Sequence, residues 1–230
     1  MAATFRASSS RVMCLPTGWE SSGSGRDPGL DSITIMRPLL VLLLAACPLS
    51  AADEFTVYDL LAPATHSFEI VYDVSATRAG AAYFCNPIRP GSVASKERVV
   101  DRASGKPLQF EMVNGRAAKT SGCVAAATAD DARFLRVKLA TPVPERAETR
   151  IRIYKTYTDP PSYYEKDGSL VFDRPLGIKR NVVILPKGYE LVGAASPAMV
   201  SMESDGRVRV SFLNDRDDRL PVKIAGRKLP

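Results

Sequence analysis

Apolar and polar residues alternate in short stretches through most of residues 53–230. Within 133–139 and again within 150–154, apolar residues occupy every second position or nearly so. A repeat of two residues places every second side chain on the same face of an extended strand. These stretches therefore predict β-strands that bury one face and expose the other.

Turn-forming residues separate the predicted strands. Ser204-Asp205-Gly206 lies between Ala198–Glu203 and Arg207–Leu213, and an Asp-Gly pair supplies the backbone geometry that tight hairpins need. Two prolines within Thr141–Glu145 predict a connection, because proline cannot donate a hydrogen bond in a central strand. About ten short strands and no convincing helical stretch predict an all-β fold, an antiparallel β-sandwich that is immunoglobulin-like or related.

A candidate export signal begins well inside the sequence. Met36 is followed by Arg37, by an apolar run over Leu39–Ala46 and by small residues up to Ala52. This order is typical of a secretory signal peptide, and the apolar run is too short to cross a bilayer as a helix. The sequence therefore predicts a disordered extension or a start assigned too early over 1–35, a signal peptide over 36–52 and a single β-sandwich domain over 53–230.

The end of the signal allows two kinds of processing. Cleavage after Ala52 releases a soluble protein that is periplasmic or secreted. The tetrapeptide Leu44-Ala45-Ala46-Cys47 resembles the bacterial lipobox, and this resemblance implies a lipid anchor on Cys47 as the alternative. Either route predicts an extracytoplasmic location, with no transmembrane span in the mature chain.

Cys85 and Cys123 are the cysteines that remain after cleavage at Ala52. Two cysteines in an oxidising compartment predict one disulfide, which in the chain-entropy model stabilises a loop of this length by about 4 kcal/mol. The two cysteines lie far apart without Cys-x-x-Cys spacing, and His66 is the single histidine. The sequence accordingly predicts neither a metal site nor a cofactor.

Four tyrosines surround the segment Asp159-Pro160-Pro161-Ser162: Tyr154, Tyr157, Tyr163 and Tyr164. Tyrosines on a loop stiffened by proline offer rigid apolar faces with a polar tip, which suits binding of a glycan or a peptide. The alternative interpretation is that some of these rings cover the end of the sandwich and pack on the prolines.

Six basic residues lie on the polar sides of predicted strands: Arg136, Lys138, Arg150, Arg152, Arg207 and Arg209. If their strands are neighbours, they form one basic face for an anionic ligand; otherwise they are ordinary solvated positions of antiparallel sheets. The formal net charge of the chain is only +6 and is spread along it. With export and no recognition motif, the charge does not predict a nucleic-acid partner.

The succession of Val99–Val113, Thr141–Tyr157 and Ser169–Glu190 resembles the N-terminal β-sandwich domain of secreted zinc aminopeptidases. The His-Glu-x-x-His helix that binds zinc in those enzymes is absent, so the resemblance carries over no functional residue. It implies an accessory-type sandwich standing alone.

These features favour an exported, non-catalytic binding or envelope-assembly module whose partner is a glycan, a peptide or an envelope protein. One alternative is a carboxylate-dependent glycan hydrolase, for which Asp130-Asp131 and the cluster Asp215, Asp217 and Asp218 are the obvious acidic groups. The acidic cluster is otherwise a solvated turn or a weak calcium site. A structural cell-envelope lipoprotein is the remaining alternative. A hydrolase requires two carboxylates that face each other across a cleft, whereas a binding module does not.

Overall fold

A computed structural model describes residues 54–230. The predicted signal peptide at 36–52, the extension before it and Cys47 lie outside the described residues. The described part contains fourteen strands, one 3-10 turn and one short α-helix. In chain order the elements are β1 (Phe55–Leu60), η1 (Pro63–Thr65), β2 (Ser67–Ala76), β3 (Tyr83–Ile88), β4 (Val93–Asp101), β5 (Phe110–Asn114), α1 (Gly115–Thr120), β6 (Arg133–Lys138), β7 (Thr149–Thr158), β8 (Tyr163–Lys166), β9 (Ser169–Leu176), β10 (Arg180–Ile184), β11 (Tyr189–Ala194), β12 (Met199–Met202), β13 (Val208–Leu213) and β14 (Leu220–Lys228).

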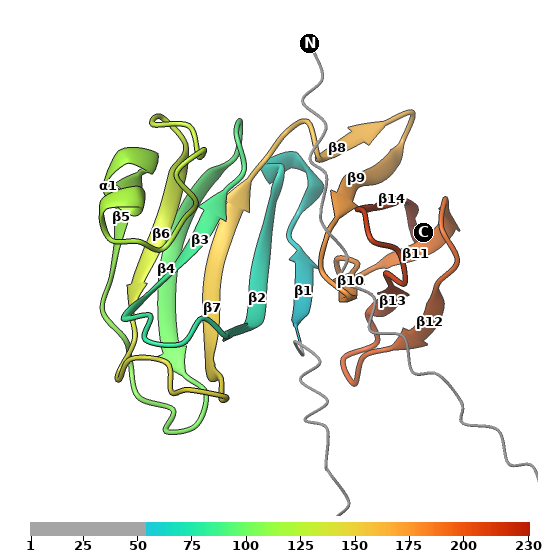
Figure 1. Ribbon diagram of the computed structural model, residues 1–230. Coiled ribbons are helices and arrows are strands. Elements are labelled where there is room, and N and C mark those ends of the chain that lie inside the picture. Colours follow the sequence, from blue (N-terminus) through green and yellow to red (C-terminus); the bar gives the residue numbers. More distant parts are fainter. Residues whose placement is uncertain (1–53) are drawn as a thin grey trace, which may run out of the picture. The chain divides into compact units, whose positions relative to one another are not determined.

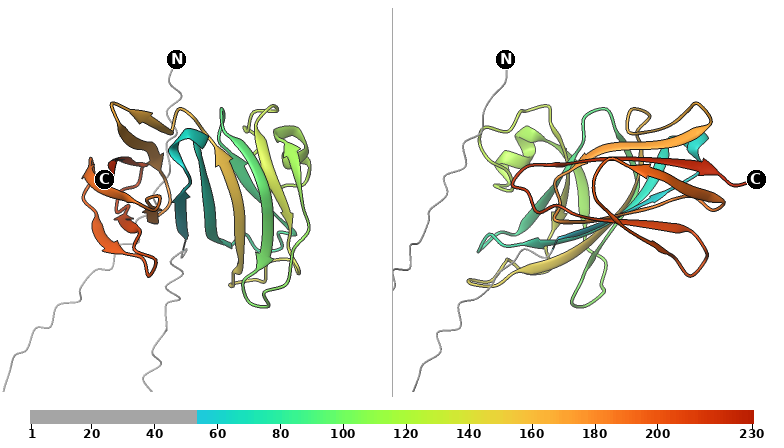
Figure 2. Two further views of the ribbon diagram at one scale, coloured as in Figure 1. Left: turned by 180° about the vertical axis from the view of Figure 1, so that it is seen from behind. Right: turned by 90° about the vertical axis from the view of Figure 1, so that its right-hand side faces the viewer.

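The strands form three sheets. The largest has seven strands in the order β12-β13-β10-β1-β2-β7-β4, and β2, β7 and β4 run side by side in it (Figure 1). A four-stranded sheet has the order β11-β14-β9-β8, and a three-stranded sheet has the order β3-β6-β5. Figure 2 shows the same ribbon from two further sides. The pairing is antiparallel except between β1 and β10, which are parallel. The predicted all-β, antiparallel-rich, sandwich-like fold is therefore confirmed, with more strands than expected.

All three sheets contribute to one hydrophobic core. Phe68 of β2, Leu135 of β6 and Phe172 of β9 each have no exposed surface. Phe68 is central, because its ring lies 5.5 Å from that of Phe172 and 6.1 Å from that of Tyr157, measured between centroids. Burial of large rings of this kind supplies much of the free energy that stabilises a β-sandwich.

Strand β7 shows how the two-residue period builds this core. Ile151 and Ile153 are fully buried on its inner face, as predicted, and Arg150 and Arg152 lie on the outer face. The inner row continues with Lys155 and Tyr157, which are also buried. A lysine thus occupies a position where the pattern of the strand calls for an apolar residue.

The predicted hairpin near the C-terminus is confirmed as β12 and β13. Met202 pairs with Val208 across the turn, and Gly206 adopts a φ of +83°, a conformation that glycine reaches without steric cost. By contrast, β1 was not predicted, although Thr56, Tyr58 and Leu60 alternate with less buried residues along it.

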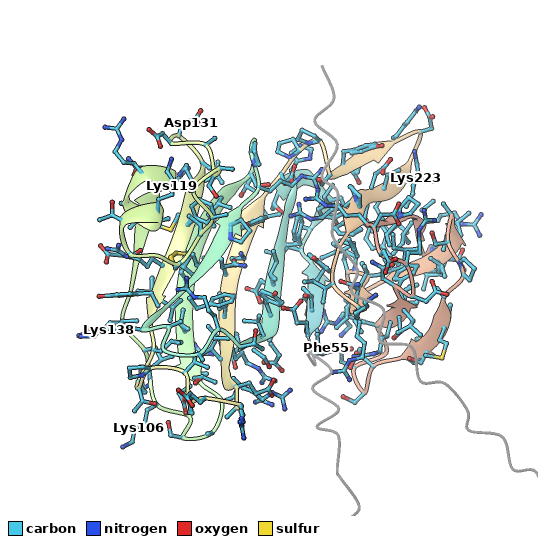
Figure 3. All side chains as sticks on the ribbon, in the orientation of Figure 1. Phe55, Lys106, Lys119, Asp131, Lys138 and Lys223 are labelled. Atoms are coloured by element: carbon cyan, nitrogen blue, oxygen red, sulfur yellow. A yellow bond between two sulfur atoms is a disulfide. The ribbon has the colours of Figure 1, made fainter. Side chains whose placement is uncertain are left out.

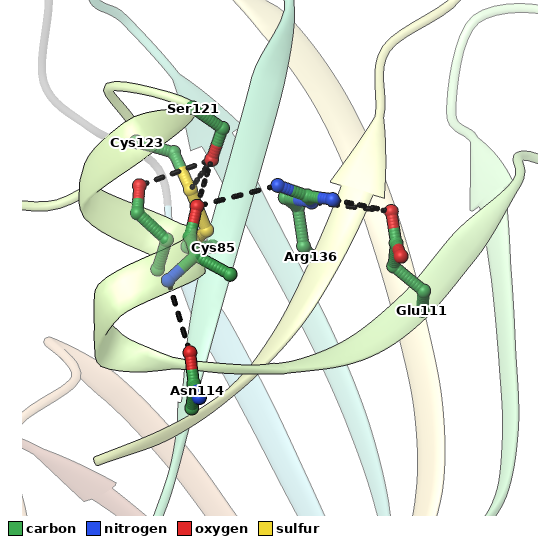
Figure 4. Close-up of a disulfide and its surroundings, with 8 residues drawn as sticks. Cys85, Glu111, Asn114, Ser121, Cys123 and Arg136 are labelled. Carbon is green, nitrogen blue, oxygen red and sulfur yellow. Dashed lines mark hydrogen bonds and ion pairs between the residues drawn. A yellow bond between two sulfur atoms is a disulfide. The ribbon is translucent and has the colours of Figure 1, made fainter. Parts of the chain in front are cut away.

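The predicted disulfide joins Cys85 of β3 to Cys123, which follows α1, with Cα atoms 5.7 Å apart (Figure 4). The short helix that it fastens begins at an N-cap, where Asn114 Oδ1 accepts a hydrogen bond from the Ala117 backbone N–H at 2.9 Å. On the side of β6, the Arg136 guanidinium donates to the backbone oxygen of Ala117 and to Glu111. The disulfide and these hydrogen bonds hold the helix against the three-stranded sheet.

Within residues 54–230, no helix has both the length and the apolar character that crossing a membrane would require.

Candidate ligand-binding pocket

A cavity of about 340 Å³ opens on the inner face of the seven-stranded sheet. Its walls come from all three sheets and from the loops that follow β3 and β9. The lining side chains with polar or aromatic groups are Thr56, Tyr58, Tyr72, Asn86, Arg89, Lys155, Tyr157, Arg174 and Arg219. Apolar residues, among them Ile70, Ile88 and Leu176, complete the walls. The volume is that of a site for a small molecule or for the end of a chain.

Strand register places Lys155 at the floor of this cavity. Ile70 of β2 pairs with Tyr58 of β1 on one side and with Lys155 of β7 on the other, so the three side chains form one row across the sheet. Lys155 is only 6% exposed. Its Nζ donates hydrogen bonds to Asn86 Oδ1 and, at 3.2 Å, to the hydroxyl of Tyr157.

Among residues 54–230, no carboxylate contacts Lys155 to match its charge. Burial, and to a lesser degree the neighbouring cation Arg174, lower the pKa of its ammonium to about 7, against a smaller opposing effect of Glu97. Desolvation disfavours the charged form of any buried lysine, and a second cation adds repulsion. Lys155 is therefore a buried amine that changes its charge near neutral pH.

Arg174 has one carboxylate partner. Its Nη1 lies 2.7 Å from Asp159 Oδ2, which also accepts a hydrogen bond from the Ser92 hydroxyl at 2.9 Å. The guanidinium carbon is 5.4 Å from the centroid of the Tyr157 ring and 5.5 Å from that of Phe68. Asp159 is 3% exposed, so this ion pair is buried and its partners are held by further hydrogen bonds.

Two further arginines lie at the cavity. Arg89 is half-buried and Arg219 is exposed, and neither forms an ion pair within residues 54–230. Burial lowers the pKa of Arg89, and the positive charges of Arg174 and Arg219 lower it further while Asp159 opposes them, so Arg89 is near enough to both cations to be repelled by them. The described lining residues include four cationic side chains and no carboxylate. Asp159 pairs with Arg174 from outside the lining.

One buried polar atom at the cavity also lacks a partner. Thr56 lines the cavity and is 2% exposed, and its Oγ1 forms no hydrogen bond with the described residues. A buried hydroxyl without a partner costs free energy, so such groups in native proteins call for an explanation.

The four candidate tyrosines do not lie together on one exposed loop. Tyr157 and Tyr163 are 2% and 0% exposed, because their rings pack around Phe68 in the core. Tyr163 also donates from its hydroxyl to the backbone oxygen of Leu61 at 2.7 Å. Tyr154 lies on the outer face of β7 beneath the Arg98 guanidinium, and Tyr164 is half-buried on β8. Of the four, only Tyr157 lines the cavity.

The predicted basic face is not formed either. Arg136 and Lys138 belong to β6 in the three-stranded sheet, whereas the other four residues belong to the seven-stranded sheet or its turn. In that sheet β10, β1 and β2 separate β13, with Arg207 and Arg209 at and beside it, from β7, with Arg150 and Arg152. Most of these residues form ion pairs with nearby carboxylates: Arg136 with Glu111, Arg152 with Asp73, Arg207 with Asp59 and Arg209 with Glu203.

One carboxylate of each acidic cluster forms an ion pair with a basic residue. Asp130 lies 2.5 Å from Lys119 Nζ, and Asp218 lies 2.6 Å from Arg216 Nε. Among residues 54–230 no group of three or more His, Cys, Asp or Glu side chains is arranged to hold a metal ion.

Comparison with known proteins gives little beyond this description. No protein-family model matches the chain, and no curated protein is similar to it. Among solved structures, an M1 zinc metallopeptidase from Deinococcus radiodurans is 12% identical with a TM-score of 0.45, over 75% of this chain and 40% of that one. An aminopeptidase N family protein from Idiomarina loihiensis is 9% identical with a TM-score of 0.43, over 76% of this chain and 29% of that one. The chain thus spans less than half the length of either structure, and a likeness of this degree supports no conclusion about activity.

Proposed function

We propose that this chain is an exported, non-catalytic binding module whose ligand occupies the cavity around Lys155. Export is inferred from the signal-like segment at 36–52, and the Cys85–Cys123 disulfide is compatible with an oxidising compartment. The ligand is a small molecule or the end of a glycan or peptide chain.

The buried lysine is the observation that carries this proposal. Removing an ammonium from water costs several kcal/mol, and an apolar residue of similar size in this row of β7 would avoid that cost. The cavity beside Lys155 is also lined by Arg89 and Arg219, which form no ion pair within residues 54–230, and by Thr56, whose hydroxyl has no hydrogen-bond partner in that part of the chain. Binding of a ligand would offset the cost of keeping these groups together.

The cavity supports binding better than hydrolysis. Glycoside hydrolysis requires two carboxyl groups on opposite sides of the scissile bond. None of the described residues that line the cavity is Asp or Glu, and Asp159 is already bound to Arg174 and Ser92. This arrangement favours the binding module over the carboxylate-dependent hydrolase.

A thermal-shift screen of the exported protein against glycan fragments, short peptides and small metabolites tests the proposal. We expect at least one ligand to raise the melting temperature of the wild-type protein, because a ligand at one hundred times its Kd stabilises the folded state by about 2.7 kcal/mol. The shift should be lost in Lys155→Met and retained in Lys106→Met, whose lysine is exposed in the turn between β4 and β5 (Figure 3). A ligand that stabilises all three proteins equally would place its site elsewhere.

A further inference from the structure

We infer that the ligand of this cavity is an organic oxyanion, with a carboxylate or phosphate head that meets the cations and a short apolar body that contacts the tyrosines. This inference rests on the proposed binding function and adds the chemical class of the ligand.

The charge of the cavity is the first argument. The cavity is lined by four cationic residues, Arg89, Arg174, Arg219 and Lys155. Within the described part of the chain, Asp159 is the one carboxylate that forms an ion pair with any of them, and it pairs with Arg174. Desolvation lowers the pKa of Arg89, and repulsion from Arg174 and Arg219 lowers it further against the opposing charge of Asp159. An anion placed among these groups would relieve both costs, because each positive charge then gains a partner in a site partly removed from water.

The chemistry of the donors is the second argument. Guanidinium groups present planar pairs of N–H donors that match the two oxygens of a carboxylate or phosphate. Arg89 and Arg219 have no ion pair within the described chain, so their donors remain available at the cavity. Lys155 adds an amine at the floor, and Thr56 adds a hydroxyl with an unused hydrogen-bonding capacity.

The apolar and aromatic residues that line the cavity indicate an apolar body for the ligand. Tyr58 and Tyr72 lie on neighbouring strands beside Ile70, and Ile88 and Leu176 face the cavity from the two smaller sheets. Such walls exclude water from an apolar group and favour its burial. A volume of about 340 Å³ holds a small molecule of this kind.

Titration calorimetry with matched probes tests the inference. Butyl, octyl and 3-phenylpropyl bodies, each carrying a carboxylate, a phosphate or a neutral primary amide, would be titrated into the exported protein at pH 6.5. We expect at least one anion to bind tenfold or more tightly than its amide. Comparison of the carboxylate probes with the phosphate probes that carry the same body shows which oxyanion binds more tightly.

Two variants locate the binding. Arg89→Gln should weaken binding of the preferred anion about tenfold and leave binding of any amide unchanged. Arg146→Gln, which changes an exposed arginine in the loop between β6 and β7, should have no effect. Circular dichroism and the melting temperature verify that both variants remain folded.

The outcomes separate the two proposals. Amides that bind as tightly as the matched anions, with affinity lost in Lys155→Met, would overturn the anionic ligand but leave the binding function standing. Anions whose affinity is the same in Arg89→Gln as in the wild type would also overturn the inference. Absence of binding by every probe, together with a thermal-shift screen without a ligand, would contradict both proposals.

Discussion

The buried position of Lys155 predicts a specific dependence of stability on pH. In the unfolded chain a lysine titrates with a pKa of about 10.4, whereas burial and Arg174 lower the pKa in the folded protein to about 7. The unfolded state therefore binds more protons between these two values, and stability must rise with pH across that window. Below pH 7 the folded protein bears the full cost of the charged amine.

The magnitude follows from the same two values. One pKa unit corresponds to about 1.36 kcal/mol, so the complete shift is worth about 4–5 kcal/mol. Integrated from pH 6 to pH 9, the contribution of Lys155 to the free energy of unfolding rises by about 2–3 kcal/mol. Lys155→Met keeps the length of the side chain and removes this titration.

Urea unfolding of the wild type and of Lys155→Met at pH 6, 7, 8 and 9 measures the effect. Because all other groups titrate alike in both proteins, the difference between their free energies of unfolding isolates Lys155. We expect that difference to move by about 2–3 kcal/mol in favour of the wild type between pH 6 and pH 9. Lys155→Met also removes the hydrogen bond to Asn86. This loss changes the free energy of unfolding of the variant by the same amount at every pH, so it does not alter how the difference depends on pH. A difference that is constant with pH, or one that changes equally for Lys106→Met, would refute the reasoning.

Three further predictions concern the fold that holds the cavity. Replacing Cys85 and Cys123 with serine should lower the free energy of unfolding by about 3–4 kcal/mol, because the disulfide closes a loop with a sequence separation of 38; equal urea midpoints with and without reductant would contradict this. Asp159→Asn should destabilise the protein by about 3–5 kcal/mol by leaving Arg174 buried without its carboxylate, whereas Asp218→Asn at the exposed pair with Arg216 should leave the midpoint of the same urea titration unchanged. Gly115→Ala should cost about 1–3 kcal/mol, since the added Cβ would lie 1.9 Å from the backbone oxygen of Ala129, while Gly177→Ala meets nothing closer than 3.6 Å and should melt like the wild type.

Local patterns in the sequence were sufficient for much of the fold. Alternation along 150–154 predicted β7, the Asp205-Gly206 pair predicted the β12–β13 hairpin, and the cysteine count predicted the disulfide. Each of these signals acts over a few residues or depends only on composition. The parallel pairing of β1 with β10 joins segments more than one hundred residues apart, and nothing local encodes it.

The grouping of the candidate site residues depended on strand order, which the sequence pattern does not give. The prolines beside the tyrosines suggested that these residues lie on a loop. Strand β7 instead continues to Thr158, so Tyr157 lies within the strand and its side chain is buried in the core. The six basic residues shared a pattern but not a sheet. One signal for the cavity was present in the sequence: Lys155 follows Ile151 and Ile153 in the row that the alternation predicts to be buried. A charged residue in such a row marks a site whose purpose is not packing alone.

A crystal structure of the protein soaked with the tightest-binding anion of the calorimetric panel tests the central claim most directly. We expect the anionic head between the guanidinium groups of Arg89 and Arg219 and within hydrogen-bond distance of Lys155 Nζ, with the apolar body against Tyr58 and Tyr72. An anion bound at another surface, with the cavity around Lys155 filled by its own side chains, would contradict the account.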